Sequence, residues 1–205
     1  KRAIGFEKVE LAGTVIPMYP TFAPNANYKV TVRPGTLTIE KAGGNRINAS
    51  DLEVYYDGEK HSITASAEID GSTVYYRDSA GNWSTELPEY TNAGTYSITA
   101  YAENPNYEAT EEITVTLTIK KIPLTITAEN KGKTYGEADP ELTALVEGIV
   151  LDGGITSAVV EGETLNYDLS RQSGENAGTY DITVNLGENP NYDITAVPGI
   201  LTISR

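Results

Sequence analysis

Aromatic side chains are the first residues of this chain whose type and spacing suit a chemical role. Trp83 is the single tryptophan, and Tyr75, Tyr76 and Tyr90 lie close to it in the sequence. Aromatic rings offer flat apolar surfaces with polar edges, so these four residues are candidates for a platform that stacks on a pyranose ring. The alternative is that Trp83 covers the end or rim of a protein core and binds no ligand.

Loop oxygens supply a second candidate, a calcium site. Calcium takes about six to eight oxygen ligands. Side chains that could provide them fall in predicted loops at Glu103, Asn104, Asp139, Asp152, Glu175 and Asn176. However, the chain has no D-x-[DN]-x-[DN]-G run, and Leu151–Gly154 contributes a single carboxylate. We therefore expect no cofactor and no metal site, with calcium as the alternative.

Catalytic residues are poorly represented. His61 is the only histidine and cysteine is absent, so neither a catalytic triad nor a zinc site can be assembled from a recognisable motif. We expect His61 to cap or pack against a neighbouring strand. Carboxylate pairs for glycoside hydrolysis are available, but a domain of about 80 residues leaves little room for a deep cleft. A Lys–Asn crosslink needs an asparagine in the closing strand, and that strand has none in either repeat. No enzyme activity is expected.

The charge balance argues against two classes of partner. The net charge is −14, with 29 acidic residues against 15 basic ones. Such a surface repels phosphate backbones and anionic lipid headgroups, so nucleic acid is not an expected partner. No stretch approaches the roughly 20 apolar residues of a membrane-spanning helix, so membrane insertion is not expected either.

An internal repeat indicates which elements position these residues. Asn-Pro-Asn-Tyr occurs at Asn104–Tyr107 and again at Asn189–Tyr192, and Asn-Ala-Asn-Tyr occurs at Asn25–Tyr28. A recurring pattern of this kind indicates repeated structural units. Each copy is followed by a predicted closing strand, at residues 35–41, 115–121 and 199–205. The predicted domains are 1–41, the back half of a repeat, followed by complete repeats at 42–121 and 122–205.

Alternation of apolar and polar residues predicts strands within each repeat. In residues 113–119 isoleucine, valine and leucine alternate with threonine, which indicates a strand with one buried face. Tyr180, Ile182, Val184 and Leu186 are predicted to share one face in the same way. Short strands separated by Gly, Pro and Asn turns favour a β-sandwich over a barrel. The predicted fold is all-β, with tandem immunoglobulin-like sandwiches arranged end to end.

Two smaller features complete this prediction. Tyr96 and Tyr180 each follow an Ala-Gly-Thr run, and we interpret them as corner tyrosines whose rings fill the core and whose hydroxyls bond to backbone. Lys120–Pro123 is the only connection between the two repeats and contains no Gly/Ser spacer. Because proline restricts the backbone, this connection predicts a semi-rigid joint.

These motifs resemble known bacterial repeats. Residues 54–121, with Tyr-Asp-Gly-x-x-His, Asn-Ala-Gly-Thr-Tyr and Asn-Pro-Asn-Tyr in order, resemble an Ig-like repeat of bacterial surface proteins. Residues 124–203 are similar to the MBG-type repeat, and Tyr135, Gly136 and Pro140 fill its Tyr-Gly-x-x-x-Pro signature. The resemblance implies an extracellular location, at the cell surface or secreted, and a stalk or adhesin-like module without catalytic apparatus. It brings no set of functional residues.

The leading hypothesis is therefore a non-catalytic stalk segment whose partners are other domains of its parent protein. The alternative is a module that binds glycan or host matrix protein through the aromatic platform, either alone or as an accessory domain of a secreted glycan-active enzyme. Residues 1–41 carry a separate expectation, because half a sandwich leaves sheet edges unpaired. Such edges favour docking on the next repeat or self-association.

Overall fold

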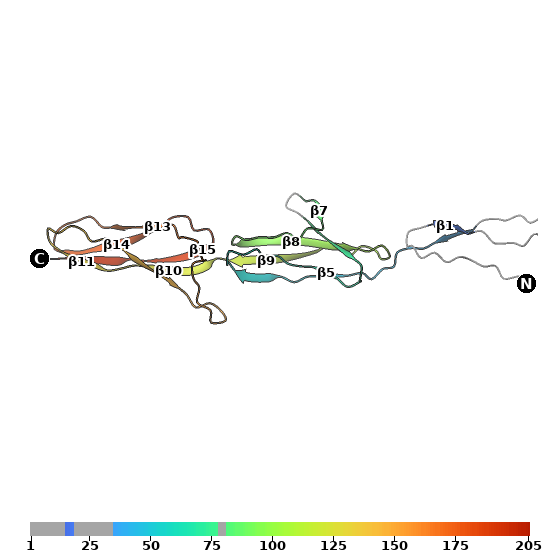
Figure 1. The fold of residues 1–205 in the computed structure, drawn as a ribbon, viewed down its shortest axis with the longest axis horizontal. Coiled ribbons are helices and arrows are strands. Elements are labelled where there is room, and N and C mark those ends of the chain that lie inside the picture. The colour runs from blue at the N-terminus through green and yellow to red at the C-terminus, as the bar shows by residue number, and fades with distance from the viewer. Residues whose placement is uncertain (1–14, 19–34, 78–80) are drawn as a thin grey trace, which may run out of the picture. The chain divides into compact units, whose positions relative to one another are not determined.

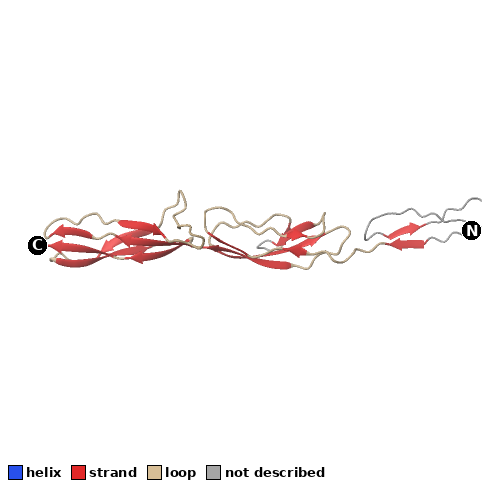
Figure 2. Cartoon of the chain, turned by 90° about the horizontal axis from the view of Figure 1, so that it is seen from below, coloured by secondary structure: helices blue, strands red, loops and turns tan. Residues whose placement is uncertain are grey.

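Strands are the only regular elements that the structure describes. The computed structural model describes residues 15–18, 35–77 and 81–205, and Figure 1 and Figure 2 show these residues as strands joined by loops. The prediction of an all-β fold is confirmed. Within the described residues, no helix is present that could cross a membrane.

The chain divides into two compact units whose boundaries do not follow the repeats. The first unit consists of Lys1–Asp51, Ile63–Pro88 and Ser97–Thr116, and the second of Leu52–Ser62, Glu89–Tyr96 and Leu117–Arg205. The second unit therefore contains one end of the first repeat together with the whole of the second repeat.

The front segment is described only in part. β1 (Val15–Met18) pairs antiparallel with β2 (Gly35–Thr38), and Val15 lies opposite Thr38. Residues 1–14 and 19–34 lie outside the described residues. The expectation that residues 1–41 dock or self-associate falls mostly on them and stays a prediction.

The first repeat contains a two-stranded sheet, β3-β5, and a five-stranded sheet in the order β4-β9-β8-β6-β7. β4 runs parallel to β9, so the second strand of the repeat lies beside its last strand. The strands are β3 (Ile47–Asn48), β4 (Leu52–Tyr55), β5 (Ser66–Ala67), β6 (Thr73–Arg77), β7 (Trp83–Ser84), β8 (Gly94–Glu103) and β9 (Ile113–Lys120).

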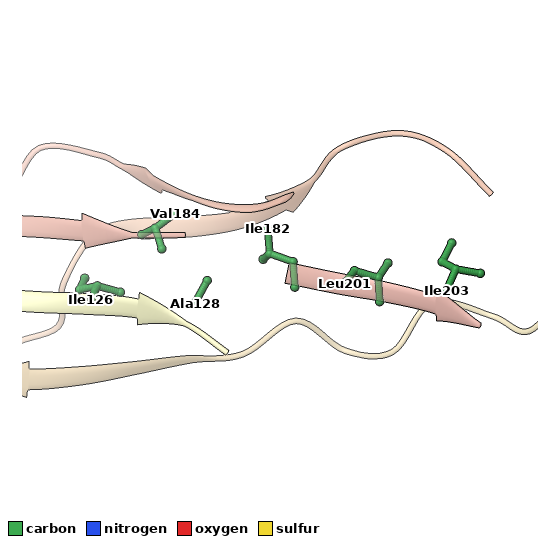
Figure 3. Packing of buried hydrophobic residues seen from close by; sticks show 6 residues of the cluster. All are labelled: Ile126, Ala128, Ile182, Val184, Leu201 and Ile203. Carbon is green, nitrogen blue, oxygen red and sulfur yellow. The ribbon is translucent and has the colours of Figure 1, made fainter. Parts of the chain in front are cut away.

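The second repeat is a sandwich of a three-stranded sheet, β12-β10-β15, and a four-stranded sheet, β11-β16-β14-β13. Its strands are β10 (Ile122–Ala128), β11 (Lys131–Thr134), β12 (Ala144–Gly148), β13 (Tyr167–Arg171), β14 (Gly178–Leu186), β15 (Tyr192–Val197) and β16 (Gly199–Ser204). The core lies between the sheets, because one sheet contributes β10 and the other contributes β14 and β16. Figure 3 shows the six buried side chains of this core, which are Ile126, Ala128, Ile182, Val184, Leu201 and Ile203.

The predicted alternation holds in most strands. In β9, Val115, Leu117 and Ile119 are buried while the threonines between them are more exposed. The prediction for Leu186 is wrong, since this last residue of β14 is 42% exposed. The core cluster reaches Val184 and not Leu186, so the alternation continues in the sequence beyond the part of the strand that the other sheet covers.

The two corner tyrosines are equivalent in the structure. Tyr96 donates a hydrogen bond from its hydroxyl to Asn92 O at 2.8 Å, and Tyr180 donates one to Asn176 O at 2.8 Å. Each hydroxyl thus bonds to the carbonyl four residues earlier and closes the turn that leads into β8 or β14. The interpretation of these residues as structural is confirmed.

Candidate functional site

The predicted aromatic platform is only partly assembled. The Trp83 ring meets the Tyr101 ring edge-on, with centroids 4.6 Å apart, and the Tyr75 ring stacks on the Tyr101 ring, with centroids 5.2 Å apart. Arg77 lies over the Trp83 ring at 5.5 Å, which is a cation–π distance. We call Tyr75, Arg77, Trp83 and Tyr101 the aromatic cluster. All four come from neighbouring strands of the five-stranded sheet.

The other two predicted platform residues lie elsewhere. Tyr76 follows Tyr75 in β6 and points to the opposite face, where it is 5% exposed and its hydroxyl accepts a hydrogen bond from Ala65 N. Tyr90 stacks on Tyr96, with ring centroids 4.0 Å apart. Tyr101 was not among the residues predicted for the platform. Its place between the buried residues Ala100 and Ala102 of β8 puts its ring on the outer face of the sheet, which the alternation in the sequence could have indicated.

His61 has the structural surroundings that were predicted for it. Its backbone N donates to Tyr90 O at 2.8 Å and its O accepts from Tyr90 N at 2.9 Å. Its Nε2 lies 2.8 Å from Asp57 Oδ1. The imidazole therefore closes the Tyr-Asp-Gly-Glu-Lys turn through Asp57, while the backbone of His61 pairs with the neighbouring segment at Tyr90.

Of the six candidate calcium ligands, Asp139 and Glu175 come together, and they do so around cations. Lys133 Nζ donates to Asp139 Oδ1 at 2.7 Å and to Glu175 Oε2 at 2.6 Å. Arg171 Nε donates to Asp139 Oδ2 at 2.7 Å, and its Nη2 donates to Glu175 Oε1. We call these four residues the ion network. Two carboxylates and two cations carry no net charge, so the network offers a divalent cation little attraction.

The ion network is built around a buried ammonium group. The side chain of Lys133 is 4% exposed, and its hydrogen bonds to Asp139 and Glu175 raise the pKa of the ammonium group. The hydrogen bond from Arg171 lowers the pKa of Asp139, and the one from Lys133 lowers that of Glu175. These pKa shifts favour the charged forms of all four groups. The buried ammonium group therefore has oppositely charged hydrogen-bond partners, which a buried charge requires.

The remaining loop oxygens are dispersed. Asn104 is buried and donates to Asp70 O and Ser72 Oγ at 3.3 and 3.1 Å. Glu103 accepts a hydrogen bond from the Tyr101 hydroxyl at 3.2 Å. Across the described part of the chain, no group of three or more acidic or histidine side chains is arranged to hold a metal ion.

The connection between the repeats forms a structured joint inside the second compact unit. The prediction that Lys120–Pro123 separates the strands is corrected, because β9 ends at Lys120 and β10 begins at Ile122. Pro123 lies within β10, where its carbonyl accepts a hydrogen bond from Ser157 Oγ at 2.6 Å. A single residue, Lys121, therefore links the two sandwiches.

The joint is formed by the Asn191–Tyr192 turn of the second repeat. Asn191 Oδ1 accepts a hydrogen bond from Ala93 N at 2.9 Å, and Asn191 Nδ2 donates to Asn92 Oδ1 at 3.3 Å. The Tyr192 ring meets the Tyr56 ring edge-on, with centroids 6.0 Å apart. The Asn-Ala-Gly and Asn-Pro-Asn-Tyr motifs of consecutive repeats thus contact each other.

Glu163 completes the joint from a loop of the second repeat. Its two carboxylate oxygens accept hydrogen bonds from the hydroxyls of Tyr56 and Tyr192. Burial and the bond to Glu163 raise the pKa of Tyr192 to about 12, and the bond to Glu163 raises that of Tyr56. Both phenols therefore stay protonated well above neutral pH, and the hydrogen bonds persist with them.

The loop that carries Glu163 also fits against the end of the first repeat. Gly58 has a φ of 81°, which favours glycine, and a Cβ there would lie 3.0 Å from Val160 Cγ1. A groove of about 720 Å³ runs beside this contact and is lined by residues 55–57, Glu59, Ile122, Leu151, Asp152 and 155–161. Sequence analysis missed the joint, since Tyr56 and Glu163 are 107 positions apart in the chain.

Comparison with known protein families identifies both repeats. The model of the MBG domain, YGX type, matches residues 124–202, and a second MBG domain model matches residues 46–123. No curated protein sequence matches the chain.

Solved structures give weaker likenesses. The D00-D0 domain of intimin is 13% identical, with coverage of 78% of this chain and 100% of its own and a TM-score of 0.31. Fibronectin(III)-like modules of CbhA from Clostridium thermocellum are also 13% identical, with coverage of 77% and 94% and a TM-score of 0.29. Neither likeness bears on function.

Proposed function

Residues 46–202 belong to the MBG domain family as two consecutive domains, and we propose that they serve as a spacer in a bacterial cell-surface or secreted protein. The spacer is part of a stalk, adhesin-like in type, that positions another domain of the parent protein away from its anchor. The proposed location is extracellular, and the proposed partners are the other domains of the same protein.

The joint is the observation that carries this proposal. A spacer must resist bending where its domains meet, and a one-residue link leaves little freedom for independent motion. The docked Asn191–Tyr192 turn adds hydrogen bonds to Ala93 and Asn92, and Glu163 bonds to tyrosines of both repeats. These contacts, all within the second compact unit, support a joint that is held together by several hydrogen bonds.

The proposal assigns no catalytic role to the chain. MBG and other immunoglobulin-like domains are typically non-catalytic, and both repeats are matched by MBG models. The net charge of −14 also favours a solvated surface over one that binds nucleic acid.

Glycan or matrix-protein binding is the second candidate, and the aromatic cluster favours it. Trp83, Tyr75 and Tyr101 gather three rings on one sheet, with Arg77 beside them. Rings and a guanidinium group of this kind can stack on a sugar or contact an acidic partner. In this case the chain would act as a binding module, including as an accessory domain of a secreted glycan-active enzyme.

An array of glycans and matrix proteins separates the two candidates. The full chain is applied in calcium and again in chelator, beside the variants Trp83→Ala and, as a matched control, Tyr135→Ala, which removes an exposed tyrosine of the other repeat. Thermal melts establish that all variants fold. The spacer proposal predicts no bound ligand in either buffer.

Binding on the array would overturn the spacer proposal in one of two ways. A ligand that is lost with Trp83→Ala and kept with Tyr135→Ala would make the aromatic cluster the binding site. A ligand that is lost only in chelator would transfer the site to the loop carboxylates and require calcium.

A further inference from the structure

The backbone hydrogen bonds at the end of β16 in the second repeat match those at the end of β9 in the first repeat, where the Asn191–Tyr192 turn is docked. We call these the far ends of the two repeats. In the first repeat, Tyr56 N donates to Lys120 O at 2.8 Å, directly after β4 pairs in parallel with β9. In the second, Tyr135 N donates to Ser204 O at 2.8 Å, directly after β11 pairs in parallel with β16. Tyr135 is therefore the counterpart of Tyr56.

The adjacent turn has a counterpart as well. The corner tyrosines bond to Asn92 O and Asn176 O with the same geometry, so Asn176 and Ala177 correspond to Asn92 and Ala93. These are the residues that, in the first repeat, hold the side chain of Asn191. Each repeat thus carries the same set of docking groups at its far end.

The two ends differ in whether the docking groups are covered. Tyr56 is 5% exposed beneath the Tyr192 ring, whereas Tyr135 is 63% exposed. A hollow of about 470 Å³ lies at Tyr135 and is lined also by Asn176, Ala177 and Arg205. Tyr135 and Asn176 are thus exposed in the second repeat. Their counterparts Tyr56 and Asn92 in the first repeat contact the docked Asn191–Tyr192 turn.

We propose that Tyr135, Asn176 and Ala177 form a socket for the Asn–Tyr turn of another MBG repeat. The occupied joint fixes this occupant, because there the docked turn belongs to the repeat that starts one residue after the closing strand. Arg205 follows Ser204 at the end of β16 as Lys121 follows Lys120 at the end of β9, so a repeat joined directly after Arg205 would have a link of the same length. Within the socket, Ala177 N donates to the asparagine Oδ1 and the incoming tyrosine ring packs against Tyr135.

The turn of the first repeat supports a docking element common to all repeats. Ala42 N donates to Asn106 O at 2.9 Å, just as Ile122 N donates to Asn191 O at 2.9 Å. Each repeat therefore bonds its own Asn–Tyr turn to a residue near its beginning, Ala42 in the first and Ile122 in the second. One difference is that Tyr135–Gly136 is one residue shorter than Tyr56–Gly58.

The socket is inferred from the joint alone and does not rest on the spacer function. It holds equally for a glycan-binding module, so the array described above and the following experiment can fail independently.

An extended chain tests the socket. A second copy of residues 122–205 is appended directly after Arg205 of the full chain, which reproduces the one-residue link. This copy carries Thr134→Ser and Thr179→Ser, at two exposed positions, so that its peptides differ in mass from those of the original repeat. Amide hydrogen exchange at Ala177 and nitration of Tyr135 by tetranitromethane are measured by mass spectrometry in the extended and the original chain. Docking predicts that exchange at Ala177 slows by about tenfold or more and that nitration of Tyr135 falls, while the terminal copy of Tyr135 stays reactive as an internal control.

Two variants make this experiment decisive. Asn191→Ala in the appended copy alone removes the docking amide and should restore fast exchange at Ala177. A second extension with residues 42–121, which carries the turn at Asn106–Tyr107, guards against failure of one appended repeat to fold. If Ala177 and Tyr135 remain as accessible in both folded extensions as in the original chain, the socket does not exist.

Discussion

The two repeats place different side chains at one equivalent position. Val54 pairs with Ile119 in the first repeat, and Lys133 pairs with Ile203 in the second, each two residues before the tyrosine of its opening motif. Val54 is half-buried, and the Lys133 side chain is 4% exposed within the ion network. The sandwich therefore accepts either an apolar side chain or an ammonium group here, provided that the ammonium group has its carboxylate partners.

The partners of Lys133 are specific to the second repeat. Glu175 directly precedes Asn176, whereas Thr91 directly precedes Asn92 at the equivalent position of the first repeat. Asp139 lies in the loop after the Tyr-Gly signature and contacts Lys133 and Arg171. The two repeats thus share their strand pairing, but only the second has a buried lysine whose charge is balanced by carboxylates. This difference leads to the following predictions.

The largest effects are expected where the repeats are most alike. Leu117 and Leu201 occupy equivalent positions in the closing strands and both are 0% exposed. Leu117→Ala and Leu201→Ala should each lower the free energy of unfolding of their own repeat by about 2–5 kcal/mol, since each leaves a cavity. Chemical denaturation followed by NMR signals of each repeat measures this, and a large loss for one variant with little or none for the other would contradict the equivalence of the two cores.

Substitution by methionine should have very different effects on stability at Lys133 and at Val54. Lys133→Met leaves Asp139, Glu175 and Arg171 without their central cation, so the melting temperature of the second repeat should fall by more than about 5 °C. Val54→Met, the matched control, replaces one apolar side chain with another and should change melting little. Similar melting temperatures for Lys133→Met and the unmodified chain would show that the ion network contributes nothing.

Acidic pH should destabilise the second repeat through the same ion network. The pKa values of Asp139 and Glu175 are lowered in the folded chain. Their contribution to stability is therefore complete above the ordinary carboxyl pKa of about 4 and is lost as the pH falls below it, towards the folded values. Melting measured between pH 6 and pH 2 should show this loss in the second repeat, and Lys133→Met should reduce it. An unchanged acid dependence in the variant would contradict this assignment.

The smallest effects are expected at the corner tyrosines. Tyr96→Phe and Tyr180→Phe each remove one hydrogen bond to a backbone carbonyl and keep the ring, so each should lower the free energy of unfolding by about 1 kcal/mol. Equal losses are expected because the two hydrogen bonds are both 2.8 Å long. Denaturant titration of the single variants provides the comparison, and clearly unequal losses would show that the two corners are not equivalent.

The sequence predicted the strands because local alternation determines them. The threonine-spaced strand at 113–119, the corner tyrosines and the sandwich all follow from patterns within a few residues of each other. The exposed Leu186 was mispredicted because alternation does not record where the opposite sheet ends. The buried Lys133 was missed although its register with Val54 could have been read from the spacing to Tyr135 and Tyr56.

The candidate sites were harder to predict than the fold. Trp83 and Tyr75 both contact Tyr101, whereas Tyr76 lies on the other face of β6, since neighbouring residues of a strand point to opposite faces. The joint could not be predicted, because Tyr56 and Glu163 meet only once both repeats have folded. Repetition of Asn-Pro-Asn-Tyr showed that the motif has a structural role, but not that it docks on the preceding repeat.

The central claim is that the Asn191–Tyr192 turn and Glu163 fix the joint. The chain has no cysteine, so spin labels at Thr95→Cys and Asp181→Cys, two exposed positions in the same compact unit, report a single distance by electron–electron double resonance. A narrow distance distribution is predicted, and Glu163→Ala combined with Asn191→Ala should broaden it. A distribution that is equally broad with and without these substitutions would contradict the claim.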